Sequence, residues 1–293
     1  MTLTDPLIAT LAVPVLVTVA VAVLLRLIGG AGTGARTAAF GIPVGLIVAV
    51  ALLPGLAPTP PVTVMEKLVW LAAAGGLIGI LIEMVTQTRF ISALAAFFWP
   101  FLAVVWTSGI DVTAVISGET PAHQFPYRVF EVSAVAGLIV GRMHQIAEVE
   151  LCAPVALIVI AAGLGAVGLA TGPGYAWAIG LPLAAAGLGW VVCNWPNRRL
   201  PFGAPGEIGG SAVAIALAGV MVYQARVPVV LVLLVLSALA IEPLARRFVA
   251  TNALTKSEAV RPIALAGILA LPAALAVVLA LYAPALIPDI YRP

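Results

Sequence analysis

The residues best suited to chemistry gather in one segment, 194–207, which follows a long apolar stretch of the sequence. Arg198 and Arg199 carry planar guanidinium groups whose N–H donors match the oxygens of a phosphate. Gly203 and Gly206 permit positive φ, and a Gly-rich loop at a helix start can hold a diphosphate. The segment therefore fits either a phosphate-binding loop or a basic loop that fixes topology by the positive-inside rule, and these residues alone favour the second.

Three glutamates lie within or beside apolar stretches, where a charged carboxylate is costly and so marks a candidate site. Glu83 and Glu242 fall near the inner ends of predicted spans, and Glu131 falls near the outer end of another. Arg89 and Arg246 follow Glu83 and Glu242 closely enough in the sequence to form ion pairs with them. For all three glutamates the preferred interpretation is local pairing, or a side chain that reaches toward the headgroups.

The elements that must position these residues are membrane-spanning helices. Hydrophobic residues make up 63% of the 293 residues, charged residues make up 9%, and the mean hydropathy is +1.18. A soluble domain of this composition would expose large apolar patches. We therefore expect one all-α transmembrane domain over residues 1–293, with about ten spans of about 20 residues each. The net charge of +2 is too small and too scattered for nucleic-acid binding.

Long apolar stretches separated by charged residues, Gly and Pro place the spans. Their predicted ranges are 7–27, 38–57, 66–85, 90–108, 128–143, 151–170, 174–193, 208–224, 227–245 and 262–287. The inner connections, among them 29–36 and 194–207, hold most of the polar and Gly-rich sequence and are predicted as loops. No internal repeat of the kind that marks many transporters is evident.

Basic residues set the predicted orientation. An outside N-terminus places ten of the 14 Lys and Arg residues on the cytoplasmic side, where such residues are retained. Both termini are then outside, and chemistry is expected at the cytoplasmic face. The N-terminus has no basic flank of the kind that precedes a signal peptide, so the first span is expected to remain. Cys152 and Cys193 have no second Cys or His at metal-ligand spacing and are expected to be core residues.

The segment 194–207 also carries a family resemblance. Its start, Asn-Trp-Pro at 194–196, resembles the cytoplasmic motif of the polyprenyl-phosphate N-acetylhexosamine-1-phosphate transferases, the superfamily of phospho-N-acetylmuramoyl-pentapeptide transferase. Gly203 and Gly206 keep the register of that motif, and Ala204 stands where the family has an Asp.

Two further stretches fall in the order of the family's motifs. The family closes an early span with Gly-Leu-Ile-Asp-Asp, and here Ile82 and Glu83 stand where the paired aspartates belong. A later motif resembles 130–141, where Ser133 and Ala136 replace acidic residues. The resemblance covers roughly residues 65–250 and implies ten spans with both termini on the periplasmic side of a bacterial inner membrane.

The activity that the resemblance implies is attack by a lipid phosphate on a nucleotide sugar, with Mg²⁺ held by carboxylates. Of the expected acids only Glu83 remains, because Ile82, Ser133, Ala136 and Ala204 replace the others. Loss of several groups that stabilise the transferred charge together abolishes useful turnover. We therefore expect a catalytically inactive relative without a cofactor, which serves as a lipid-binding, regulatory or assembly protein in cell-envelope glycan biogenesis.

The resemblance and the basic character of the inner loops together suggest a site for substrate or a lipid phosphate. Its expected residues are Glu83, Arg89, Asn194, Trp195, Arg198, Arg199, Gly203 and Gly206. The expected partners are membrane lipids, polyprenyl phosphate among them, and a second copy of the chain or a larger membrane complex. Two alternatives stay open: a small ten-span transporter or permease, and an active transferase whose Mg²⁺ site is rearranged onto Glu83, Glu207 and Glu242.

Overall fold

The chain is a multi-pass helical membrane protein. In the computed structural model, the described residues are 5–53, 61, 63–85, 89–107, 139, 141–147, 151–196, 199–252, 255 and 257–282. Across these residues the secondary structure is helical, with no strand. Among them, 7 helical runs are long and apolar enough to cross a membrane. The expected all-α membrane class is therefore confirmed.

The first helical run, Ile8–Leu52, folds back on itself as a hairpin. It comprises η1 (Ile8–Ala12), α1 (Val13–Gly29), η2 (Gly30–Gly34), α2 (Ala35–Thr37), η3 (Ala38–Phe40) and α3 (Gly41–Leu52). Gly41 and Gly45 of α3 lie against the backbone of Thr18 and Pro14 in α1, so the two helices are antiparallel. The prediction of a loop at 29–36 is wrong. There the chain winds through short helical turns, since Gly34 lets its backbone lie against the Leu25 carbonyl, where a Cβ would be 2.2 Å from the oxygen.

The remaining helices follow the predicted spans closely at most boundaries. They are α4 (Val64–Val85), α5 (Arg89–Thr107), α8 (Cys152–Thr171), α9 (Gly174–Cys193), α10 (Gly203–Gly206), η4 (Glu207–Ser211), α11 (Ala212–Tyr223), α12 (Val229–Leu236), α13 (Ala238–Thr251) and α14 (Arg261–Tyr282). Most of the predicted fifth span, 128–143, lies outside the described residues. The run Gly203–Tyr223 starts five residues before the predicted 208–224, so Gly203–Gly206 is the first helical turn and not part of a loop.

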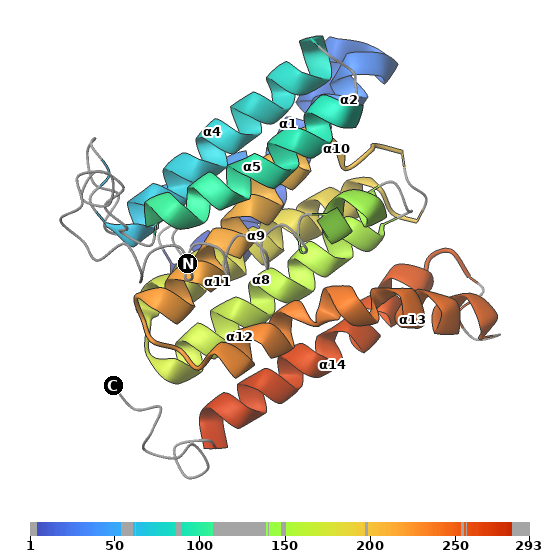
Figure 1. Cartoon of the computed structure of the whole chain (residues 1–293). Coiled ribbons are helices and arrows are strands. Elements are labelled where there is room, and N and C mark those ends of the chain that lie inside the picture. Colours follow the sequence, from blue (N-terminus) through green and yellow to red (C-terminus); the bar gives the residue numbers. More distant parts are fainter. Residues whose placement is uncertain are drawn as a thin grey trace.

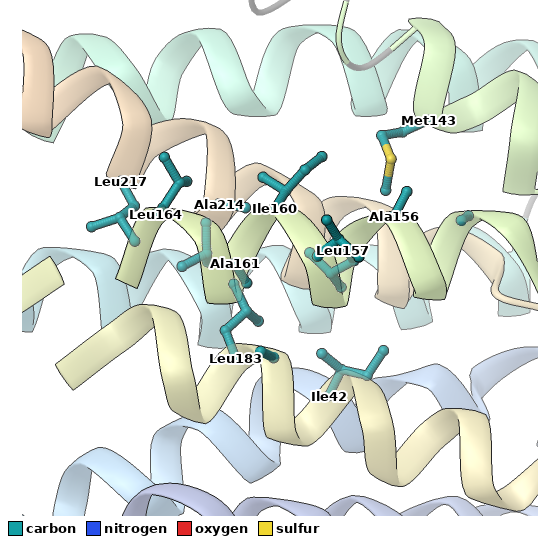
Figure 2. Close-up of a cluster of buried hydrophobic side chains, with 14 of the residues drawn as sticks. Ile42, Met143, Ala156, Leu157, Ile160, Ala161, Leu164, Leu183, Ala214 and Leu217 are labelled. Atoms are coloured by element: carbon teal, nitrogen blue, oxygen red, sulfur yellow. The ribbon is translucent and has the colours of Figure 1, made fainter. Parts of the chain in front are cut away.

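The helices pack in layers around α8, α9 and α11. Figure 1 shows α4 and α5 on one side of these central helices and α12, α13 and α14 on the other, while α1 and α3 pack on α9. Burial follows this order: 78% of the α8 span window is buried, against 28% for α14. In Figure 2, side chains of α8 such as Leu157 and Leu164 meet Ile42 of α3, Leu183 of α9 and Leu217 of α11.

The outward faces of the outer helices are apolar. Large hydrophobic side chains such as Leu27, Leu169 and Leu271 are exposed, at 75%, 68% and 65%. In water such a surface would be an aggregation hazard, whereas in a bilayer it matches the solvent.

The two ends of the bundle are chemically distinct. At one end, Lys67 Nζ donates to the Trp106 carbonyl at 3.3 Å and Gln224 Nε2 donates to the Thr107 carbonyl, which joins the start of α4 to the ends of α5 and α11. At the other end, α4 finishes beside the start of α10. We call this second end, which holds Glu83, Glu207 and Glu242, the polar end.

Candidate functional site

The carboxylate of Glu83 caps a helix at the polar end. Its Oε1 accepts a hydrogen bond from the backbone N–H of Ala204 at 3.0 Å, in the first turn of α10. The run from α10 through α11 is continuous, so its N-terminus carries the positive end of a 21-residue helix dipole. An anion is favourable at such a position. Here the protein supplies that anion from its own side chain.

Gly203 is shaped for this contact. Its φ of +46° lies in the left-handed region, which favours glycine. A Cβ at this position would lie 2.7 Å from the Arg36 carbonyl oxygen and 3.1 Å from Glu83 Oε1. The structure thus brings Glu83 and Gly203, two of the predicted site residues, into one cluster with Ala204, and it adds the backbone of Arg36.

Helix α4 meets α10 and η4 through backbone contacts, which we call the glycine seam. A Cβ on Gly79 would lie 2.5 Å from Pro205 Cα, and a Cβ on Gly75 would lie 2.4 Å from the Ile208 carbonyl oxygen. Gly209 of η4 lies against Gly76 in the same way: a Cβ on Gly209 would lie 3.0 Å from Gly76 Cα. Small residues allow this approach between helices in lipid. The seam brings the two backbones together directly below the Glu83 cap.

Asn194 shapes the connection between α9 and α10. Its side chain is fully buried, and Oδ1 accepts hydrogen bonds from the backbone N–H groups of Arg199 at 2.9 Å and Leu200 at 2.7 Å. Nδ2 donates to the Trp190 carbonyl at 3.0 Å. Trp195 is half-buried and packs against the core. These contacts give Asn194 and Trp195 a role in holding the loop.

The other predicted site residues are dispersed. Gly206 lies against the ring of Phe202, where a Cβ would be 2.9 Å from Cε2. Arg199 is exposed, so its guanidinium is accessible at the polar end. The side chain of Arg89 and all of Arg198 lie outside the described residues.

Two buried glutamates contact an arginine and a histidine of the segment 141–147. Glu207 is 7% exposed, and its Oε2 lies 2.9 Å from His144 Nδ1. Glu242 is fully buried, and its Oε2 accepts a 2.5 Å hydrogen bond from Arg142 Nη2. Glu242 Oε1 lies 3.6 Å from Arg246 Nε, which confirms the predicted Glu242–Arg246 pair. We refer to Arg142, Glu242 and Arg246 as the arginine clasp.

These three described glutamates of the polar end therefore have separate partners. Glu83 binds a backbone N–H, Glu207 a histidine and Glu242 two arginines. Among the described residues, no group of three or more His, Cys, Asp or Glu side chains is placed to hold a metal ion. Glu131, Ser133 and Ala136 lie outside the described residues.

Sequence reasoning missed Arg142 and His144 as partners of the buried acids. They lie 100 and 63 residues from Glu242 and Glu207, so no local spacing pointed to either contact. The available signal was their place beside an apolar run, where an ionisable group needs a partner. Of the two cysteines, Cys152 is buried and Cys193 is half-buried.

Comparison with models of known protein families finds none that matches this chain, and comparison with curated proteins finds no match either.

Proposed function

We propose that this protein is a non-catalytic relative of the polyprenyl-phosphate sugar-1-phosphate transferases, which binds an anionic lipid at the cytoplasmic face of a bacterial inner membrane and serves in envelope glycan assembly. The Asn-Trp-Pro motif and the order of the three motifs support the relationship. The exposed Arg199 beside the motif supplies a donor for a lipid phosphate.

The Glu83 cap is the observation that carries the non-catalytic part of the proposal. Transfer of a sugar phosphate brings several negative charges together, and Mg²⁺ with its carboxylate ligands neutralises them. Glu83 is the one acid retained in the aligned motifs, and its Oε1 is engaged by the Ala204 N–H at 3.0 Å. Ala204 itself is 1% exposed and offers no ligand oxygen from its side chain.

Ten spans with both termini outside are part of the proposal. Thr107 lies at the end opposite the polar end, whereas Leu151 lies beside Arg246 and Arg261 at the polar end. A single further crossing between these residues, as predicted for 128–143, accounts for this change of side. Helix α14 then runs from the polar end to the opposite end (Figure 1), which is where an outside C-terminus requires it to finish.

The test of catalysis uses the full chain in lipid nanodiscs with undecaprenyl phosphate, UDP-N-acetylglucosamine and Mg²⁺. We expect no UMP above protein-free nanodiscs, while an active transferase of the family releases UMP under the same conditions. Release of UMP by the wild-type protein that is lost in Glu83→Gln would overturn the proposal and make Glu83 catalytic.

The test of binding measures radiolabelled undecaprenyl phosphate retained by the purified protein. Arg199→Ala should retain several-fold less lipid, because it removes a forked phosphate donor. Arg26→Ala is the matched control, since Arg26 is also an exposed arginine of the inner helix ends but is remote in sequence from the motif. Failure of the wild-type protein to retain the lipid, or equal losses in both variants, contradicts this site.

A further inference from the structure

The helical run Val229–Thr251 is interrupted between α12 and α13, at Ser237. The Ser237 hydroxyl donates to the Leu234 carbonyl at 2.7 Å, and a serine that bonds to an earlier carbonyl in this way favours a bend in a helix. Six residues further on, Pro243 has no N–H to offer the Leu239 carbonyl, which weakens the next turn. The run can therefore bend between Ser237 and Pro243, and we call this stretch the α13 hinge.

Beyond the hinge, α13 borders open space on two faces. One space is a pocket of about 300 Å³ between α8, α13 and α14, which Arg246, Val249 and Ala250 line from α13. The other is an apolar groove of about 460 Å³ along α13 and α14, which Leu244 and Phe248 line from α13. At about 100° per residue, Arg246 and Ala250 lie on nearly the opposite face of the helix from the groove residues. A tilt of α13 toward the groove therefore widens the pocket.

The ion pair between Arg142 and Glu242 restrains such a tilt. Glu242 of α13 is fully buried, and its Oε2 accepts a 2.5 Å hydrogen bond from Arg142 Nη2, which belongs to the segment 141–147. Arg246 is a residue of α13 itself, so its 3.6 Å contact with Glu242 moves together with the helix. Of the two arginines of the clasp, Arg142 is thus the one that ties α13 to another part of the bundle.

The place of Glu242 near the hinge gives this pair control over the end of the helix. At about 1.5 Å per residue, Glu242 lies about 7.5 Å beyond Ser237 and Thr251 about 21 Å beyond it. A tilt of about 10° then moves Glu242 by about 1.3 Å and Thr251 by about 3.7 Å. The smaller movement alone breaks the hydrogen bond to Arg142, whose donor–acceptor distance must stay below about 3.2 Å.

We propose that α13 is a hinged gate on the pocket between α8, α13 and α14, and that the Arg142–Glu242 pair holds the gate closed. Release of the pair lets α13 turn about its hinge, away from α8 and toward the apolar groove. Pro196 of the Asn-Trp-Pro motif also lines the pocket, so opening uncovers this side of the motif. The inference does not depend on the proposed function, because α13, its hinge and the clasp define the gate.

Double electron–electron resonance on the full chain in lipid nanodiscs measures the position of the gate. After replacement of Cys152 and Cys193 by alanine, nitroxides are attached at Met84→Cys on α4 and Thr251→Cys on the last turn of α13. Both native side chains are exposed, and Figure 1 shows the two helices on opposite sides of the central helices. The intact clasp should give one narrow distance distribution. Arg142→Gln should lengthen the mean distance by about 4 Å, as expected for a tilt of about 10°.

Two further variants separate the gate from a general loss of packing. Glu242→Gln should lengthen the same distance, and it leaves no buried carboxylate without a partner, so it keeps the test available if Arg142→Gln fails to fold. Arg246→Ala is the matched control. It removes the other arginine of the clasp but cannot release α13 from the segment 141–147, so the distance should stay unchanged.

A second nitroxide pair reports on the bundle without α13. Met84→Cys and Leu169→Cys join the ends of α4 and α8, and Leu169 is 68% exposed. This distance should be equal in all variants, and a change in it identifies a misfolded protein. With this distance constant, an unchanged distance between positions 84 and 251 in Glu242→Gln overturns the proposal. An equal lengthening in Arg246→Ala overturns it as well.

Discussion

Replacement of Arg142 by Ala should destabilise the protein by about 2–3 kcal/mol. The carboxylate of Glu242 is fully buried, and Arg142 Nη2 is its nearer cation at 2.5 Å. Removing one partner of a buried ion pair costs about 3–5 kcal/mol when the remaining charge is left alone. Here Arg246 stays 3.6 Å from the other carboxylate oxygen and recovers part of that cost.

Replacement of Arg246 by Ala should cost less, at about 0.5–1 kcal/mol. Its side chain is 47% exposed, and its contact with Glu242 is 3.6 Å long. Water and counterions therefore screen this pair more than the pair with Arg142, whose side chain is 29% exposed. The two arginines of the clasp thus contribute unequally to stability. Because both contact the same carboxylate, one variant serves as a control for the other.

Thermal unfolding in detergent micelles, followed by tryptophan fluorescence, measures this difference. Trp190 is fully buried and reports loss of the core. At roughly 2–4 °C per kcal/mol, Arg142→Ala should lower Tm by about 4–12 °C and Arg246→Ala by less than about 4 °C. In a double-mutant cycle, Arg142 and Glu242 should show a coupling energy above about 1 kcal/mol. Equal Tm losses in the two arginine variants, or a larger loss in Arg246→Ala, would refute the assignment of Arg142 as the principal partner.

Three further predictions concern the loop, the cap and the topology. Gly203→Ala should lower stability by about 1–2 kcal/mol in the same thermal assay, because Gly203 has a positive φ and its added Cβ would lie close to the Arg36 carbonyl. Gly267→Ala is the control: no atom lies within 4 Å of the added Cβ, so this variant should be neutral or slightly stabilising. Asn194→Ala should cost about 2–3 kcal/mol and speed hydrogen exchange at residues 199 and 200, because two N–H groups lose their acceptor; unchanged exchange there contradicts the bonding. In a cysteine-free background, Gly174→Cys should react with an impermeant maleimide on intact cells, and Ser257→Cys only after permeabilisation. The reverse pattern rules out the proposed orientation.

The membrane class and most helix boundaries could be predicted from the sequence, because apolar length alone determines a span in lipid. The span 174–193 coincides with α9. Prediction failed where glycine is abundant, at 29–36 and 203–206. There low intrinsic helix propensity is outweighed by close backbone packing, which only small residues permit.

The chemistry of the polar end was less accessible from the sequence. The pair Glu242–Arg246 has helical i,i+4 spacing and was therefore predictable. The contacts of Arg142 and His144 join segments far apart in the chain, and they depend on how the helices pack. Glu83 was singled out as an ionisable group at membrane depth, but its partner is a backbone N–H that no side-chain pattern can indicate.

The glycine seam also bears on the proposed relationship to metal-dependent transferases. An Asp introduced at position 204 would place a second carboxylate where the native side chain is 1% exposed, next to the acid that already caps the helix. The adjoining backbones are too close for one helix to slide or roll aside and make room, since Gly79 and Gly75 have no clearance for even a methyl group. If the proposed relationship to the transferases holds, a metal site at position 204 would therefore require α4 and η4 to move apart together, and a single substitution there would destabilise the protein.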